Sequence, residues 1–315
     1  MTESKNDITL NQILRILPLR IRKAVSSAVT GCFSQIHEIV LRSSRPVCIY
    51  KNGVQYFLTE NGCLTSLSDS QPLVIISANE MTECFNFACG HSVYSHINEI
   101  KEGFVTINGG HRVGISGTAV VSNEEVTNIR DFSTISIRIS REIIGCGNEL
   151  AKHLFESKEG LLICGAPCSG KSTVLRDIAR ILSSDYLCRV CVIDSKSELA
   201  AVYKGILQKD LGMCDVMDSY PRDVGIMQAI RLFSPEYIIC DEIGSESDVN
   251  ALLSGVNSGV YFVATMHAGS LSELKSRRYF TSIVSTGAFK KIAFLSGRES
   301  PGKVKSYIES CDFYA

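Results

Sequence analysis

The sequence predicts an α/β protein in which a mostly parallel sheet, flanked by helices, follows a smaller α+β domain. One observation is a set of short, continuous apolar runs separated by helical stretches, at residues 161–164, 190–193, 237–240 and 260–264. Strands buried on both faces of a parallel sheet have this pattern, because helices cover both faces. The other is a change of pattern after Gly145-Cys-Gly147, before which helix-like and strand-like segments are mixed, as in an α+β region. We therefore expect two domains, 1–147 and 148–315.

The amino-terminal domain is expected to begin with helices. Apolar residues recur at helix-like spacing between residues 11 and 29, and Pro18 is expected to divide that stretch into two short helices. A further helix is predicted over 78–98. Strands are predicted at 38–42, 46–50, 56–58, 73–76, 104–108, 112–116 and 135–139, with Gly109-Gly110 as the turn of a hairpin. In the second domain, strands are also expected near 291–295 and 304–308.

The composition argues against several classes of protein. Hydrophobic residues make up 45% and charged residues 21% of the 315-residue chain, as in an ordinary globular protein. The net charge of -1 provides no overall attraction to nucleic acid or anionic lipid. No apolar run approaches the ~18–20 residues needed to cross a bilayer, and the polar start lacks a signal peptide. We expect a cytoplasmic protein that could still dock on a membrane through another protein.

The 13 cysteines lie mostly inside apolar runs, where reduced thiols behave as small buried hydrophobes. Cys188 and Cys191 have CxxC spacing, but they fall in a strand-like run that should place them on opposite faces. Core cysteines are therefore the favoured interpretation. A zinc site is a minor alternative for four residues whose spacing matches no established zinc pattern: Cys84, Cys89, His91 and His96.

The most specific motif is Gly165-x-x-x-x-Gly170-Lys171-Ser172, here called the phosphate loop, between an apolar strand and a predicted helix. Its glycines let backbone N–H groups point at phosphate oxygens, and the helix N-terminus adds partial positive charge. Lys171 is expected to reach the β- and γ-phosphates, and Ser172 to offer its hydroxyl to Mg²⁺. A chance glycine-rich turn is the weaker explanation. The residues predicted to bind ATP are Gly165, Ala166, Pro167, Cys168, Ser169, Gly170, Lys171, Ser172 and Thr173.

Other apolar strands end in polar residues, which a parallel sheet would gather at one edge. Asp241 is expected to hold Mg²⁺, and Glu242 to orient or deprotonate the attacking water, unless both belong to a solvated strand end. The strand at 190–193 leads into Asp194 and Glu198, of which Glu198 could be a second catalytic acid or a surface residue. His267 could sense the γ-phosphate or be a capping or core histidine.

These motifs occur in the order seen in secretion and type IV pilus ATPases, which the chain resembles. The order is the phosphate loop, an acidic box at 194–198, Asp241-Glu242-Ile-Gly, and Ala264-Thr-Met-His267. Segments at 38–46, 103–117, 136–142 and 294–302 look like those of the stage III sporulation protein AA family. The 103–117 segment, for example, reads Gly-Phe-Val-Thr-Ile-Asn-Gly-Gly-His-Arg-Val-Gly-Ile-Ser-Gly. The resemblance covers nearly the whole chain.

The resemblance implies a RecA-like ATPase core that binds ATP and Mg²⁺ in the mother cell of an endospore-forming bacterium. It implies a homo-oligomer, a hexameric ring, on the cytoplasmic face of an integral-membrane channel protein at the forespore boundary. In ATPases of this kind the amino-terminal domain closes over the nucleotide and supplies arginines to phosphate. Arg112, Arg138 and Arg141 are the candidates here, with ordinary strand-surface charge as the alternative.

Three departures from the family pattern bear on these expectations. The acidic box reads Asp194-Ser-Lys-Ser-Glu198 where Asp-Glu-Arg-Ser-Glu is expected, which removes one acid and one arginine. Ser245 stands where an arginine is expected, so a contact made in relatives could be missing. Cys168 lies inside the phosphate loop, where side chains point away from phosphate, so we expect it to be tolerated.

The leading functional hypothesis is a mechanical ATPase whose hydrolysis cycle moves a membrane partner. A single-stranded nucleic-acid-associated ATPase is one alternative, although the net charge and the absence of an added nucleic-acid-binding module after His267 argue against it. We therefore expect no direct nucleic-acid partner. A nucleotide-sensing scaffold with little turnover is the other alternative.

Overall fold

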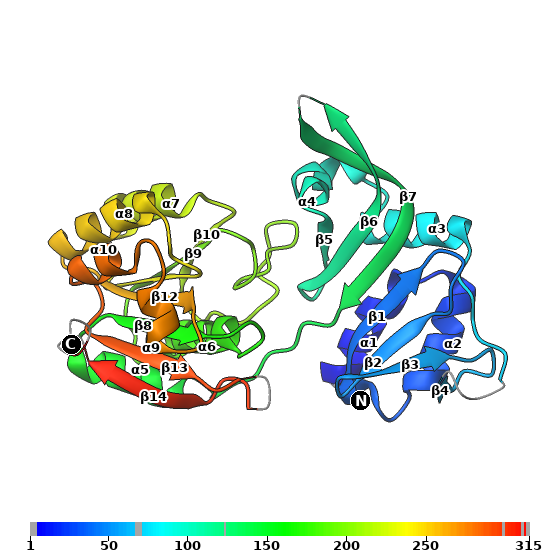
Figure 1. The fold of residues 1–315 in the computed structure, drawn as a ribbon, viewed down its shortest axis with the longest axis horizontal. Coiled ribbons are helices and arrows are strands. Elements are labelled where there is room, and N and C mark those ends of the chain that lie inside the picture. The colour runs from blue at the N-terminus through cyan, green and yellow to red at the C-terminus, as the bar shows by residue number, and fades with distance from the viewer. Residues whose placement is uncertain (1–4, 67–70, 123, 298–299, 310–311, 313–315) are drawn as a thin grey trace. The chain divides into compact units, whose positions relative to one another are not determined.

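A computed structural model of the protein describes residues 5–66, 71–122, 124–297, 300–309 and 312, and these form two compact units (Figure 1). Unit 1 comprises Met1–Arg141 and Tyr203–Gln208, and unit 2 comprises Glu142–Val202 and Lys209–Ala315. The expected boundary at residue 147 falls shortly after the start of unit 2. Residues 203–208 cluster with unit 1, where the Gln208 side-chain oxygen accepts a 2.7 Å hydrogen bond from the Gly109 amide.

Unit 1 is an α+β structure built on a seven-stranded antiparallel sheet, with strand order β4-β3-β2-β1-β7-β6-β5. Its strands are β1 (Ile36–Arg42), β2 (Cys48–Lys51), β3 (Val54–Leu58), β4 (Leu64–Thr65), β5 (Phe104–Ile107), β6 (His111–Ser122) and β7 (Glu125–Arg138). Its helices are α1 (Lys5–Arg15), α2 (Leu19–Val29), α3 (Ala78–Ala88) and α4 (Ile97–Lys101), with 3-10 turns η1 (Phe33–Gln35) and η2 (Val93–His96). Helices and strands share one large apolar core.

Several elements of unit 1 differ from the sequence prediction. Pro18 separates α1 from α2, as expected, because its ring fixes φ at −53° just before α2 begins. The helix predicted over 78–98 ends at Ala88, because Gly90 and His91 both adopt left-handed backbone (φ 55° and 60°). The predicted strand at 73–76 forms only isolated bridges. Strands β6 and β7 extend well beyond prediction and pair with each other as a long hairpin (Figure 1).

Unit 2 contains a seven-stranded sheet in the order β10-β9-β11-β12-β8-β13-β14, in which only the β13–β14 pair is antiparallel. Its strands are β8 (Leu161–Gly165), β9 (Val190–Asp194), β10 (Asp215–Asp218), β11 (Tyr237–Cys240), β12 (Tyr261–His267), β13 (Lys291–Leu295) and β14 (Val304–Glu309). Its helices are α5 (Asn148–Ser157), α6 (Lys171–Ser184), α7 (Arg222–Phe233), α8 (Glu246–Asn257), α9 (Leu271–Lys275) and α10 (Phe280–Ser285). Strand β10 was not predicted.

Helices cover both faces of this sheet, which explains the continuous apolar runs in its strands. Successive residues of β8 alternate between two cores: Leu162 packs in the core that includes α7, α8 and α10, and Leu161 packs in the core that includes α5 and α6. Cys191 and Cys188 lie in these two different cores, as the sequence predicted. Within the described part of the chain, no helix combines the length and apolar character needed to cross a bilayer.

Candidate nucleotide-binding site

The candidate site lies where four neighbouring parallel strands of unit 2 end at one edge of the sheet. His267 at the end of β12 stands opposite Gly165 at the end of β8. Cys240 at the end of β11 stands opposite Ala264 of β12 and Ile193 of β9. This register brings the phosphate loop, the acidic box, the Asp241–Glu242 pair and His267 to the same edge, as the sequence predicted.

The phosphate loop joins β8 directly to α6 and depends on both of its glycines. Gly170 has φ 91° just before α6 begins, and a Cβ there would lie 2.6 Å from the Gly302 backbone nitrogen. A Cβ on Gly165 would lie 2.4 Å from the Ser169 hydroxyl oxygen. Neither position can accept a side chain without displacing its neighbour. The Cys168 side chain is exposed and its backbone is left-handed (φ 63°), and its tolerance in the loop stays a prediction.

The ammonium group of Lys171 has hydrogen-bond partners in the phosphate loop and at the end of β12. Its Nζ donates hydrogen bonds to the carbonyl oxygens of Gly165 (2.8 Å) and Ala166 (3.0 Å) and lies 3.1 Å from His267 Nδ1. Burial lowers the pKa of Lys171, and the nearby Glu242 carboxylate opposes this shift. Because a protonated lysine only donates, His267 Nδ1 must be the acceptor, which places the imidazole proton on Nε2.

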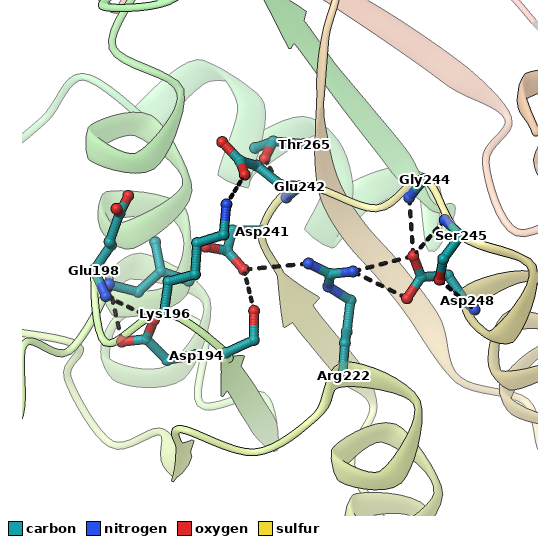
Figure 2. Close-up of polar contacts among 12 residues, drawn as sticks. Asp194, Lys196, Glu198, Arg222, Asp241, Glu242, Gly244, Ser245, Asp248 and Thr265 are labelled. Carbon is teal, nitrogen blue, oxygen red and sulfur yellow. Dashed lines mark hydrogen bonds and ion pairs between the residues drawn. The ribbon is translucent and has the colours of Figure 1, made fainter. Parts of the chain in front are cut away.

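The carboxylate of Glu242 is held between two donors (Figure 2 shows its place beside Lys196). His267 Nε2 lies 2.6 Å from Glu242 Oε1, and the Lys196 ammonium pairs with Oε2. The backbone of Glu242 is left-handed (φ 42°), and its amide donates to Thr265 Oγ1 at 2.9 Å. Burial alone raises the pKa of Glu242, but the hydrogen bonds from Lys196 and His267 outweigh it and leave the pKa below its ordinary value.

Asp194 is a structural anchor for the acidic box. Its carboxylate accepts hydrogen bonds from the backbone amides of Glu198, Leu199 and Ala200 at 2.8, 2.9 and 2.8 Å. The side chain is completely buried, and this burial raises the pKa of Asp194 to about 6 although the backbone hydrogen bonds act in the opposite direction. Three amide donors therefore fix the turn that leads from β9 to Glu198.

Glu198 is positioned through its main chain. Its amide donates to Asp194, and its carbonyl accepts a 2.9 Å hydrogen bond from Arg176 Nη2. Its carboxylate raises the pKa of both Asp241 and Lys196, so it contributes to the negative field of the site. A catalytic role for Glu198 stays a prediction.

Asp241 is connected to the start of α8 through a partly buried arginine that the sequence did not single out (Figure 2). Arg222 Nη1 donates to both carboxylate oxygens of Asp248 at 3.0 Å, and Nη2 lies 4.0 Å from Asp241 Oδ1. Asp248 also accepts 2.9 Å hydrogen bonds from the amides of Gly244 and Ser245. Arg222 and Asp248 thus tie together the two ends of the loop that carries Glu242.

Substitution of Arg222 by Ala should lower the free energy of unfolding by about 3 kcal/mol, because it leaves Asp248 buried without its counter-charge. The Arg222 and Asp248 side chains are only 14% and 2% exposed. Chemical denaturation measures the change. Arg231→Ala, an exposed position on the same helix, is the control and should cost less than about 0.5 kcal/mol. Equal stability of the two variants would show that the buried pair contributes nothing.

The oxygen donors at this edge suit a magnesium nucleotide. Ser172 lies in the first turn of α6 with its side chain partly exposed, and Asp241, directly after β11, is 2% exposed. A hydroxyl and a carboxylate are the ligand types that Mg²⁺ prefers, with phosphate oxygens and water completing its octahedron. The glycine cradle and the N-terminus of α6 are suited to the phosphates.

A cavity of about 430 Å³ opens beside the catalytic candidates in unit 2. Its lining includes Glu242, His267, Arg277, Arg278 and Tyr279. It gives solvent a path to the carboxylate of Glu242. A larger hollow of about 680 Å³ belongs to unit 1, next to α2, and contains none of the residues discussed above. The smaller cavity is therefore the one relevant to chemistry at this site.

Sequence reasoning missed four residues that shape the site: Lys196, Arg222, Asp248 and Thr265. Lys196 was visible only as a departure from the family pattern, although it contacts Glu242 directly. Thr265 lies in the same strand end as His267, a signal that could have drawn attention to it. Arg222 comes from α7 and carried no recognisable signal.

The three candidate arginines all lie in unit 1. Arg112 and Arg138 stand directly opposite each other on β6 and β7. The Arg112 guanidinium stacks 3.6 Å from the centroid of the Phe104 ring, and Arg138 lies 3.7 Å from Glu38. Arg141 donates a 2.7 Å hydrogen bond to the Phe33 carbonyl. Their contact with phosphate stays a prediction.

Solved structures define the class to which this fold belongs. The ATPase DotB of Yersinia pseudotuberculosis matches with a TM-score of 0.55 at 16% identity, covering 88% of this chain and 75% of that chain. The pilus retraction motor PilT with bound ADP matches with a TM-score of 0.51 at 13% identity, covering 84% of this chain and 76% of that chain. The protein therefore has the fold of the secretion ATPases, with a RecA-like core, as the sequence predicted.

The family follows from two further matches. The family model for sporulation stage III, protein AA matches residues 8–311. The chain is also 33% identical over 301 residues to stage III sporulation protein AA of Bacillus subtilis (strain 168), a match that covers 94% of each. The chain belongs to the sporulation stage III, protein AA family.

Proposed function

We propose that this protein binds ATP with Mg²⁺ at the phosphate loop and hydrolyses it. The observation that carries the proposal is the direct connection at the strand ends between Lys171 of the loop, His267 and Glu242. This connection supports the proposal, because it joins the candidate base Glu242 through His267 to the lysine expected to bind the γ-phosphate. The ATPase fold shared with DotB and PilT supports the same assignment.

In this proposal each residue has a distinct task. Residues 165–173 bind the phosphates through backbone amides, and Lys171 neutralises the β- and γ-phosphate oxygens. Ser172 and Asp241 would hold Mg²⁺, which when bound would supply charge to stabilise the transferring phosphoryl group.

In this proposal, Glu242 and its neighbouring residues position and deprotonate the attacking water. Glu242 orients the water and accepts its proton, and the left-handed backbone held by Thr265 aims the side chain. His267 keeps Glu242 in place and responds to the phosphate through Lys171. Glu198 is the second acid, and it adds negative charge around Asp241.

Phosphate release from ATP tests the activity directly. Purified protein should release phosphate with Mg²⁺ and lose at least about 100-fold of that rate when EDTA removes the metal, because the metal-bound charge stabilisation disappears. The membrane partner should be added in a parallel reaction. Negligible release with Mg²⁺, both with and without that partner, would favour a nucleotide-sensing scaffold over an ATPase.

We further propose that the protein works as a homo-oligomeric, hexameric ring that energises a membrane channel between mother cell and forespore. The ring would stand on the cytoplasmic face of an integral-membrane sporulation protein, without direct contact to nucleic acid. The family assignment and the secretion-ATPase fold support this role. Arg112, Arg138 and Arg141 are then candidates to reach nucleotide when the ring closes.

A further inference from the structure

A continuous series of contacts links the phosphate loop to the acidic box. Lys171 Nζ lies 3.1 Å from His267 Nδ1, and His267 Nε2 lies 2.6 Å from Glu242 Oε1. The other oxygen of Glu242 pairs with the ammonium of Lys196. Both oxygens of the candidate base are therefore engaged by donors of this chain. In hydrolysis, one of them must accept a hydrogen bond from water instead.

The two donors differ in how nucleotide binding would affect them. His267 is connected to Lys171, so phosphates that attract Lys171 would release His267 Nδ1 from its present donor. Within the described part of the chain, the Lys196 ammonium contacts Glu242 and no residue of the phosphate loop, and the negative field around it comes from Glu242, Asp241 and Glu198. Nucleotide binding would therefore act on the His267 side of Glu242, while the Lys196 side has to open by its own motion.

The Lys196 side chain can change its conformation, in contrast to the side chain of Arg222. Its side chain is 47% exposed and lies on the turn after β9, so its ammonium can exchange the carboxylate for water. The Arg222 side chain is 14% exposed and donates to both carboxylate oxygens of Asp248, so its position is fixed. The turn under Lys196 is meanwhile held by Asp194, so the lysine can swing without loss of the acidic box.

We propose that Lys196 is a positioning residue that restrains Glu242 and keeps basal ATP turnover low until its ammonium moves away. This inference rests on the proposed function, because it assumes that Glu242 is the base for ATP hydrolysis. The Lys196 ammonium occupies the Glu242 oxygen that an attacking water would need. A partner that attracts Lys196 would then activate the enzyme.

The test compares Lys196→Met with Lys196→Arg and with Lys152→Met, which removes an exposed lysine from the outer side of α5. A partly exposed ion pair shifts an equilibrium by up to about five-fold, so Lys196→Met should raise kcat roughly three- to five-fold with KM for ATP unchanged. Lys196→Arg and Lys152→Met should keep the wild-type rate. The gain should vanish when Glu242→Gln is combined with Lys196→Met.

The outcomes separate this inference from the proposed function. A wild-type enzyme that hydrolyses ATP together with a Lys196→Met variant that is no faster, or is slower, overturns the restraint by Lys196 alone. A gain that persists in the Glu242→Gln background also overturns it, because the effect would not act through Glu242. No hydrolysis by wild type or Lys196→Met, with or without the membrane partner, rejects the ATPase proposal itself.

Discussion

Glu242→Gln should bind ATP as well as the wild type does and turn it over ~10²–10⁴-fold more slowly, the usual contribution of a positioned general base. Glutamine has the same shape and can still accept a hydrogen bond from His267 Nε2, but it cannot take a proton from water. The Asp241 and Ser172 oxygens are unchanged, so affinity for the magnesium nucleotide should persist. Single-turnover phosphate release measures the rate, and fluorescence of a labelled nucleotide measures binding.

The matched control for this experiment is Glu198→Gln, which removes the other carboxylate expected near the phosphate. The charge of Glu198 raises the pKa of Asp241 and of Lys196, and in the proposed mechanism Glu198 does not take the proton from water, so its loss should have the smaller effect on turnover. Full turnover by Glu242→Gln together with a large loss in Glu198→Gln would transfer the role of base to Glu198.

Lys171→Ala should weaken ATP binding by roughly 30-fold or more, because the phosphates lose a buried, hydrogen-bonded charge partner. The fold itself should survive. Lys171 is 7% exposed and its burial disfavours the charged form, so its removal relieves a desolvation cost while two loop carbonyls lose a donor. Thermal unfolding with and without Mg²⁺ and a non-hydrolysable ATP analogue measures both effects, since a ligand that binds the folded state raises its melting temperature.

The analogue should raise the melting temperature of the wild type by much more than that of Lys171→Ala. In sedimentation, the same analogue should promote ring formation by the wild type only. Lys275→Ala, an exposed lysine in α9 of the same unit, is the control and should respond as the wild type does. An equal nucleotide-induced rise in melting temperature for Lys171→Ala would contradict the assignment of the phosphate loop.

The sequence by itself determined the features that depend on neighbouring residues or on burial. The phosphate loop is contiguous, so its glycines, lysine and serine could be recognised together and placed between β8 and α6. The apolar runs revealed strands covered on both faces, because such strands have no solvent side and need no polar positions. Pro18 marked a helix boundary because its ring restricts the backbone locally. These features required no knowledge of which strands are neighbours.

Only the tertiary structure decided which polar groups contact one another at the sheet edge. The strand order β9-β11-β12-β8 brings Lys196, Glu242 and His267 together, and it is set by packing among distant segments. For that reason Asp194 could be read as part of an acidic box but not as the anchor of its turn. The Arg222–Asp248 pair was likewise invisible, since a contact between α7 and the start of α8 depends on how two helices pack and leaves no periodic pattern in the chain.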